Sequence, residues 1–188
     1  MEQSELTLHQ LLRCRHVKRW HIVRVARDQT VAEHSWAVTM IARHLCDRLG
    51  LFLSPSDMLM MVEWSLMHDA TETVIGDLPT PTSEVVGRWM RDKEMAISTA
   101  WGVRHAWASS AMDGLPLEIV KMADIIEAIS FLDDDAVGAH AERVELALRA
   151  RLVERINGAE IRYPRLPWPE AVHQTLNDSM TMNGPSHD

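Results

Sequence analysis

The chain has 188 residues, of which 46% are hydrophobic, and its net charge is -8. A chain of this size and apolar content can enclose one substantial core, so we expect a single domain over residues 1–188, with its core at about 5–180 and a flexible tail at 183–188. Acidic and basic residues are interspersed, so no broad positive field exists to attract nucleic acid or an anionic membrane surface. We therefore expect neither as a partner.

The cysteine content and the apolar segments indicate the compartment. Cys14 and Cys46 are too few for a disulfide framework or a cysteine zinc site, which fits a reducing environment. The N-terminal segment is acidic and polar, unlike a signal peptide, and no stretch has about eighteen uncharged apolar residues. The sequence therefore predicts a cytoplasmic protein.

Apolar residues recur at helical spacing through most of the chain, which predicts an all-α fold. The segment Thr30 to Glu33 has the form of a capping box and predicts the start of a helix, and Gly50 marks its end. Ser54 to Asp57 combines a capping serine, a first-turn proline and an acidic residue, so it predicts a second start. This second helix is predicted to run into the segment Met67 to Glu72.

Proline and glycine mark the later breaks in the chain. The segment Gly76 to Pro81 predicts a loop, and prolines between residues 164 and 169 precede a short last helix. Between these breaks we expect three helices, at about 83–101, from Pro116 through Ile129, and at about 136–156.

The second predicted helix is apolar until its end, where His68, Asp69 and Glu72 occur together. Carboxylates resist burial unless a positive charge compensates them. On a continuous helix, His68 and Glu72 would share a face, with Asp69 about 100° away from His68. Imidazole and carboxylate groups in this arrangement predict a site for a divalent metal ion.

Further ligands must come from other helices, because this segment alone does not complete a metal site. His34 lies in the first turn of its predicted helix, and Asp124 interrupts an apolar helix, so both are polar groups where burial is expected. Taken singly, His34 or Asp124 could instead be an ordinary hydrogen-bonded core or capping residue that binds no metal. We assign Glu33 to the capping box with Thr30, and the acidic run 133–135 to a solvated helix boundary.

The motifs occur in a fixed order along the chain: Arg19-Trp20, Val31 to Ser35, His68 to Glu72, Gly76 to Pro81 and Lys121 to Asp124. This series resembles the HD-domain metal-dependent phosphohydrolases, which implies a single helical HD bundle. Within that group it is similar to the YfbR-like 5'-deoxynucleotidases and to the related phage dATP triphosphohydrolases. The resemblance extends from about Leu11 to Leu132, and beyond that only the helical character matches.

The resemblance implies a metal centre whose ligands are His34, His68, Asp69 and Asp124. By ligand type, such a centre suits Co²⁺, Zn²⁺, Mn²⁺, Fe²⁺ or Ni²⁺. It also implies that Glu72 and Asp77 are catalytic, acting near the attacking water or binding a second ion such as Mg²⁺. A bound ion polarises a phosphoryl oxygen and lowers the pKa of water, and a carboxylate can take the proton.

The resemblance further implies that the substrate is held by four residues. Arg19 offers a guanidinium fork and Lys121 a point charge for phosphate, whereas Trp20 offers an aromatic face and Ile22 a bulky group for a purine base. One departure concerns phosphate recognition. The segment Thr82-Ser83 stands where the bacterial nucleotidases have a residue followed by a lysine.

We therefore expect a metal-dependent phosphohydrolase that attacks the 5' α-phosphorus of a deoxynucleotide and releases the deoxynucleoside. The turn Arg19 to Ile22 resembles the base-binding turn of the phage enzymes, which favours dATP as the substrate. Hydrolysis of deoxynucleoside monophosphates is the close alternative. A regulatory HD module that binds a nucleotide without turnover is a more distant one, and the presence of Glu72 and Asp77 argues against it.

The large apolar side chains bear on assembly. The chain has seven tryptophans and twelve methionines, more than one compact core obviously needs. We expect some of them to line an interface in a homo-oligomer, as the resemblance also implies. A monomer whose core is rich in Met and Trp is the alternative.

Overall fold

The computed structural model describes residues 8–77, 79 and 114–180. Within these ranges the chain is helical, and its only β-type pairings are isolated bridges, Lys18 with Thr30 and Val25 with Ala136. The elements are α1 (Leu8–Leu11), the 3-10 helix η1 (Leu12–His16), α2 (Val31–Arg48), α3 (Pro55–Met67), α4 (Glu72–Ile75), α6 (Leu115–Asp135), α7 (Ala139–Arg162) and α8 (Trp168–Met180). The expected all-α fold is confirmed over the described residues.

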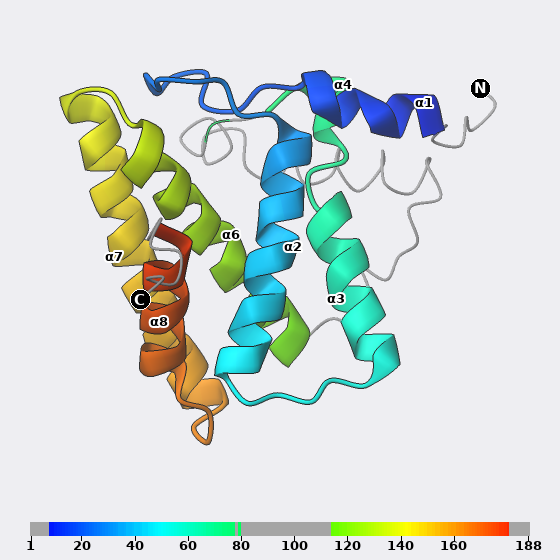
Figure 1. The fold of residues 1–188 in the computed structure, drawn as a ribbon, viewed down its shortest axis with the longest axis vertical. Coiled ribbons are helices and arrows are strands. Elements are labelled where there is room, and N and C mark those ends of the chain that lie inside the picture. The colour runs from blue at the N-terminus through cyan, green and yellow to red at the C-terminus, as the bar shows by residue number, and fades with distance from the viewer. Residues whose placement is uncertain (1–7, 78, 80–113, 181–188) are drawn as a thin grey trace, which may run out of the picture.

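Helices α2 and α6 pack against each other at the centre of the bundle, with α3 on one side and α7 and α8 on the other (Figure 1). The main core lies between these helices. Its largest fully buried side chains include Leu45, Met61, Ile126, Ile129 and Trp168. This packing fixes α2, α3 and α6 relative to one another, and these are the helices that carry or precede the predicted metal ligands.

The predicted helix starts are confirmed by their capping bonds. At the start of α2, the Thr30 side chain accepts from the Glu33 amide while the Glu33 carboxylate accepts from the Thr30 amide, which is the reciprocal capping box. At the start of α3, the Ser54 hydroxyl accepts from the Asp57 amide. Gly50, with φ of 66°, takes the left-handed conformation after α2.

The second helix ends in the predicted segment Met67 to Glu72, but His68 and Glu72 do not lie on one continuous helix as their shared face requires. Helix α3 ends at Met67, the next residues form a tight turn, and α4 begins at Glu72. In this turn the Ala70 amide donates to the Met67 carbonyl and the Glu72 amide to the Asp69 carbonyl, so the bonds span three residues instead of four. The tighter winding changes the directions of His68 and Asp69 from those of a regular helix.

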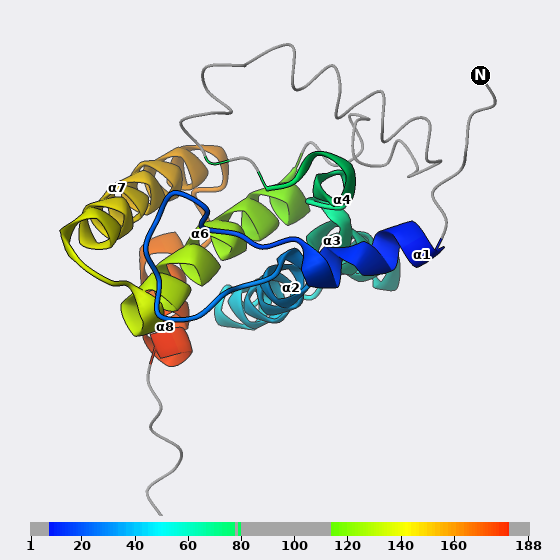
Figure 2. The ribbon, with the colours of Figure 1, turned by 90° about the horizontal axis from the view of Figure 1, so that it is seen from above.

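The segment between η1 and α2, residues 17–30, arches over one end of α6 and α7, as Figure 2 shows. Its ends are joined by backbone hydrogen bonds from the Arg19 amide to the Gln29 carbonyl and from the Val31 amide to the Val17 carbonyl. Its middle is tied to the end of α6 by the Ala26 amide, which donates to the Asp135 carbonyl. The arch places the predicted substrate-binding turn beside α6.

Other predictions on the fold have mixed outcomes. The polar helix expected at 136–156 is longer, Ala139–Arg162, and follows Gly138 at φ 84°. The expected helix at 83–101, the segment Thr82-Ser83 and the tail at 183–188 lie outside the described residues. In the described ranges, no helix is both long and apolar enough to cross a membrane.

Candidate metal centre

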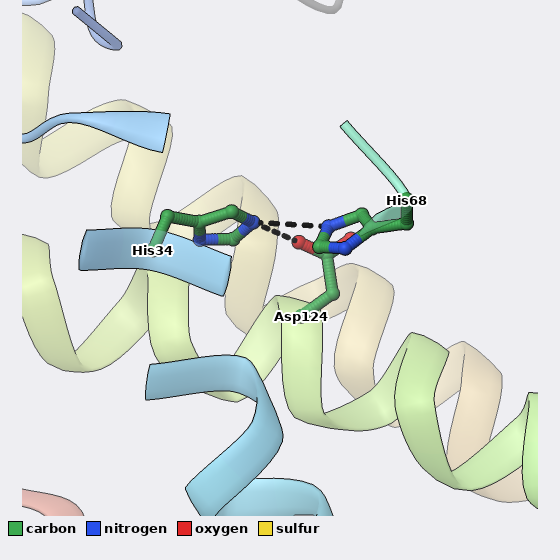
Figure 3. A group of neighbouring side chains, drawn as sticks. All are labelled: His34, His68 and Asp124. Carbon is green, nitrogen blue, oxygen red and sulfur yellow. Dashed lines mark hydrogen bonds and ion pairs between the residues drawn. The ribbon is translucent and has the colours of Figure 1, made fainter. Parts of the chain in front are cut away.

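His34 is fully buried in the first turn of α2, and its ring is oriented by a carboxylate. Its Nδ1 lies 2.5 Å from Glu127 Oε2, and when that carboxylate is ionised it can only accept, so the bond then places the proton on Nδ1. The Nε2 lone pair is then free to bind a metal. Figure 3 shows this nitrogen pointing toward His68 and Asp124.

His68, directly after α3, presents the same nitrogen. Its Nδ1 lies 2.8 Å from the Ser65 carbonyl oxygen, to which it donates, so its Nε2 also carries a lone pair. The two Nε2 atoms are 3.2 Å apart (Figure 3). Two lone pairs at this distance repel unless a cation lies between them, so the donor set fits a bound metal ion.

Two carboxylates complete the group. Asp124 Oδ1 lies 3.2 Å from His34 Nε2, and Asp69 Oδ2 lies 3.5 Å from His34 Nε2 and 3.3 Å from His68 Nε2. With metal–ligand bonds of about 2.0 to 2.2 Å, the ligand atoms of a tetrahedral site are about 3.3 to 3.6 Å apart. The observed spacings to the histidines are close to this range. The ligand atoms of His34, His68 and Asp124 all lie within 4.8 Å of one another, so one ion could contact these three, and Asp69 lies beside the two histidines.

Glu127 is a site residue that sequence reasoning missed. It lies on α6 one turn after Asp124, is almost fully buried, and accepts hydrogen bonds from His34 and, at 2.5 Å, from Gln29 Nε2. Burial raises the pKa of Glu127 to about 7, although Arg19 and the Gln29 bond favour the ionised form. Its position three residues from Asp124 in an apolar helix was the signal that could have identified it.

A cavity of about 780 Å³ opens from the metal centre. Asp69 and Asp124 lie in its wall, and so do the two predicted catalytic carboxylates, Glu72 and Asp77. Asp77 Oδ2 is 4.0 Å from His21 Nε2, and burial raises the pKa of Asp77, an effect that the positive charge of Arg19 opposes. The structure therefore brings two of the predicted ligands, Asp69 and Asp124, and both predicted catalytic residues to one pocket.

Three of the four predicted substrate contacts line this cavity. Arg19 Nη1 lies 3.4 Å from Glu127 Oε2; burial alone would lower the pKa of Arg19, but the charge of Glu127 raises it. Trp20 stacks on Phe131 with ring centroids 5.7 Å apart and planes 4° apart. Ile22 is 54% exposed. Lys121 is exposed on α6 and is not among the residues that line the cavity, so its role stays a prediction.

The cavity has a second wall, formed by α7, which the sequence did not indicate. The α7 residues that line it are His140, Val144, Ala147, Leu148 and Arg151. These residues reach the site because α7 packs beside α6 in the tertiary fold. Nothing in their local pattern distinguishes them from an ordinary polar helix.

Comparison with known proteins gives consistent matches. The family described as 5'-deoxynucleotidase YfbR-like matches residues 7–91. The dATP triphosphohydrolase of Salmonella phage PMBT28 is 34% identical over 160 residues, covering 81% of this chain and 79% of that protein. The dATP triphosphohydrolase of cyanophage S-2L is 29% identical over 150 residues, covering 79% and 82%.

A solved structure supports the same assignment. The cyanophage S-2L HD phosphohydrolase (DatZ), bound to dA and one catalytic Zn²⁺ ion, has a TM-score of 0.73 and 26% sequence identity to this chain. The match covers 94% of this chain and 96% of that one. With the helical bundle, the two histidines and the carboxylates described above, these relationships show that the chain belongs to the YfbR-like and DatZ-like HD-domain phosphohydrolases and is a hydrolase that uses a divalent metal ion.

Proposed function

We propose that this enzyme hydrolyses dATP to deoxyadenosine and triphosphate. The observation that carries the proposal is one cavity lined both by the turn Arg19 to Ile22 and by Asp69 and Asp124, the carboxylates beside the buried histidines. The phage relatives described as dATP triphosphohydrolases, and the related structure with dA and Zn²⁺, support the same substrate. His34, His68, Asp69 and Asp124 are the proposed metal ligands.

In the proposed reaction, the oxygen of a water molecule attacks the α-phosphorus, the bond between that phosphorus and O5' breaks, and O5' takes a proton. A divalent ion held at this centre supplies charge that polarises a phosphoryl oxygen and lowers the pKa of water. Glu72 and Asp77 line the cavity and are the proposed groups that orient the water and accept its proton. Burial raises the pKa of Asp77, which makes the carboxylate a better proton acceptor.

The base is proposed to lie against Trp20 and Ile22, and the phosphates between Arg19 and the α7 wall of the cavity. Trp20 is the proposed platform for the purine ring, and Ile22 fills space beside it. Arg19 is the proposed phosphate contact nearest the metal. On the opposite wall, Arg151 lines the cavity without an ion pair to any residue in the described ranges, so a second cation is available for the β- and γ-phosphates.

Hydrolysis of deoxynucleoside monophosphates is the second candidate, and the match of residues 7–91 to the YfbR-like 5'-deoxynucleotidases favours it. The two reactions share the attack on the α-phosphorus and differ in the leaving product. The test is incubation of the purified protein with Co²⁺ and either dATP or dAMP, with the products separated by ion-exchange chromatography. Triphosphate from dATP supports the proposal; turnover of dAMP alone contradicts it.

We further propose that the enzyme is a cytoplasmic homo-oligomer. Trp36 and Met40, one turn apart on α2, are 63% and 50% exposed, and apolar surface of this kind is typical of a subunit interface. The net charge of -8 supports the proposal that neither nucleic acid nor anionic lipid is a partner. Sedimentation at tens of micromolar would contradict the assembly if it gave only a monomer.

A further inference from the structure

A continuous series of hydrogen bonds runs from the proposed base platform to a proposed metal ligand. Trp20 Nε1 donates to Gln29 Oε1 at 2.8 Å, and Gln29 Nε2 donates to Glu127 Oε1 at 2.5 Å. The other oxygen of that carboxylate, Oε2, accepts from His34 Nδ1 at 2.5 Å. Indole N–H can only donate and an ionised carboxylate can only accept, so the amide of Gln29 has one orientation that satisfies both neighbours.

The middle of this series is closed to solvent. Gln29 is 2% exposed, and Glu127 and His34 are also buried. Hydrogen bonds in such surroundings are stronger than at the surface, and a buried group that loses its partner is not rescued by water. The Gln29 side chain therefore constrains both the indole of Trp20 and the carboxylate of Glu127.

Closure of the arch does not depend on this side chain. The backbone bonds between Arg19 and Gln29 and between Val17 and Val31 already join its ends. Trp20, at φ 66°, is the only non-glycine residue with a positive φ in the described ranges, a backbone conformation that bulky residues rarely adopt. A strained conformation persists only where its surroundings hold it, and the bond to Gln29 is one of the contacts that do so.

We propose that Gln29 is a positioning residue that couples Trp20 to the metal ligand His34 through Glu127. Gln29 itself lies outside the residues that line the cavity, so it acts through its two neighbours. Any change that misplaces the indole is transmitted to the carboxylate, and the carboxylate sets the tautomer and orientation of His34. By linkage, a base bound against Trp20 and a metal ion bound by His34 strengthen each other. This last consequence rests on the proposed function.

The first test uses Trp20→Phe, which retains an aromatic ring but removes the indole donor. The residue is not a metal ligand, yet we expect the variant to bind Co²⁺ about 5-fold more weakly in a competition titration without nucleotide. Gln29→Leu should weaken Co²⁺ binding about 10-fold, as outer-shell changes do. In the double variant, Trp20→Phe should have no further effect, because the connection is already broken.

The second test exchanges the amide of Gln29 and the carboxylate of Glu127 between the two positions. Gln29→Glu alone places two carboxylates against each other and should weaken Co²⁺ binding. The double variant Gln29→Glu with Glu127→Gln restores every donor and acceptor: the new carboxylate accepts from Trp20 and from the new amide, whose oxygen accepts from His34. Its Co²⁺ affinity should recover most of the loss. Failure to recover, in a variant with wild-type helicity, would overturn the coupling.

Thr175→Val is the matched control, because Thr175 is buried on α8 and its hydroxyl donates to the Ala171 carbonyl, a bond that is not part of this series. It should lower Tm without changing Co²⁺ affinity. Unchanged Co²⁺ binding in Trp20→Phe, or effects of Trp20→Phe and Gln29→Leu that multiply in the double variant, would also overturn the proposal. These titrations contain no nucleotide, so they give a result whether or not dATP is the substrate.

Discussion

Replacing Glu127 by Gln should change how the stability of the metal-free protein depends on pH. Burial raises the pKa of Glu127 from 4.5 to about 7 in the folded chain. A carboxyl group whose pKa is raised by folding is easier to bury when neutral, so its contribution to stability is fully present below pH 4.5 and is lost as pH rises through 7. At 1.36 kcal/mol per unit, the loss amounts to about 3 kcal/mol.

The assay is urea unfolding of metal-free wild type and Glu127→Gln, at steps between pH 4 and pH 8. Subtracting the two unfolding free energies cancels the other titrating groups. The wild type should lose about 3 kcal/mol relative to the variant between pH 4.5 and pH 7, and the difference should then level off. Adding Zn²⁺ should reduce the loss, because a cation bound through His34 favours the ionised carboxylate.

Glu33→Gln is the control with the opposite sign. The capping bonds of Thr30 lower the pKa of Glu33, so its contribution is present above pH 4.5 and is lost as pH falls through the lowered pKa. A difference for Glu127→Gln that stays flat across pH 4.5 to 7, or that runs in the direction of the Glu33 control, would refute the assignment of a buried, hard-to-ionise carboxylate behind His34.

Three further predictions concern the site. Ile22→Ala should raise kcat/KM for dGTP and for the 2-aminoadenine deoxynucleotide relative to dATP, because space opens beside the purine; unchanged ratios with a lowered Tm would remove Ile22 from base selection. Asp69→Ala should lose most metal affinity and turnover, as chelation should in the wild type, and normal metal content measured by elemental analysis would exclude it as a ligand. Arg151→Ala should raise KM for dATP several-fold and leave KM for dAMP nearly unchanged, since in the proposed binding mode only the triphosphate extends to α7; equal effects on both substrates would refute a β- or γ-phosphate contact.

The sequence by itself determined the helical starts and the residue types of the site. The capping box at Thr30 and the serine cap at Ser54 rest on bonds between residues three apart, so they could be recognised locally and are confirmed. His34 and Asp124 were selected because each is a polar residue on a helix face built for burial. These features can be recognised in the sequence because they depend on residues that are only a few positions apart.

The geometry of the site was decided by tertiary structure. The sequence could not show that α3 ends before His68, because a tight turn and a helix differ only in the directions in which they send the same side chains. It also could not identify Gln29 and Glu127 as partners, since they are separated by 98 residues and meet only when α6 packs beside the arch. A contact between distant residues depends on how whole helices pack, and each helix pattern alone is compatible with many packings.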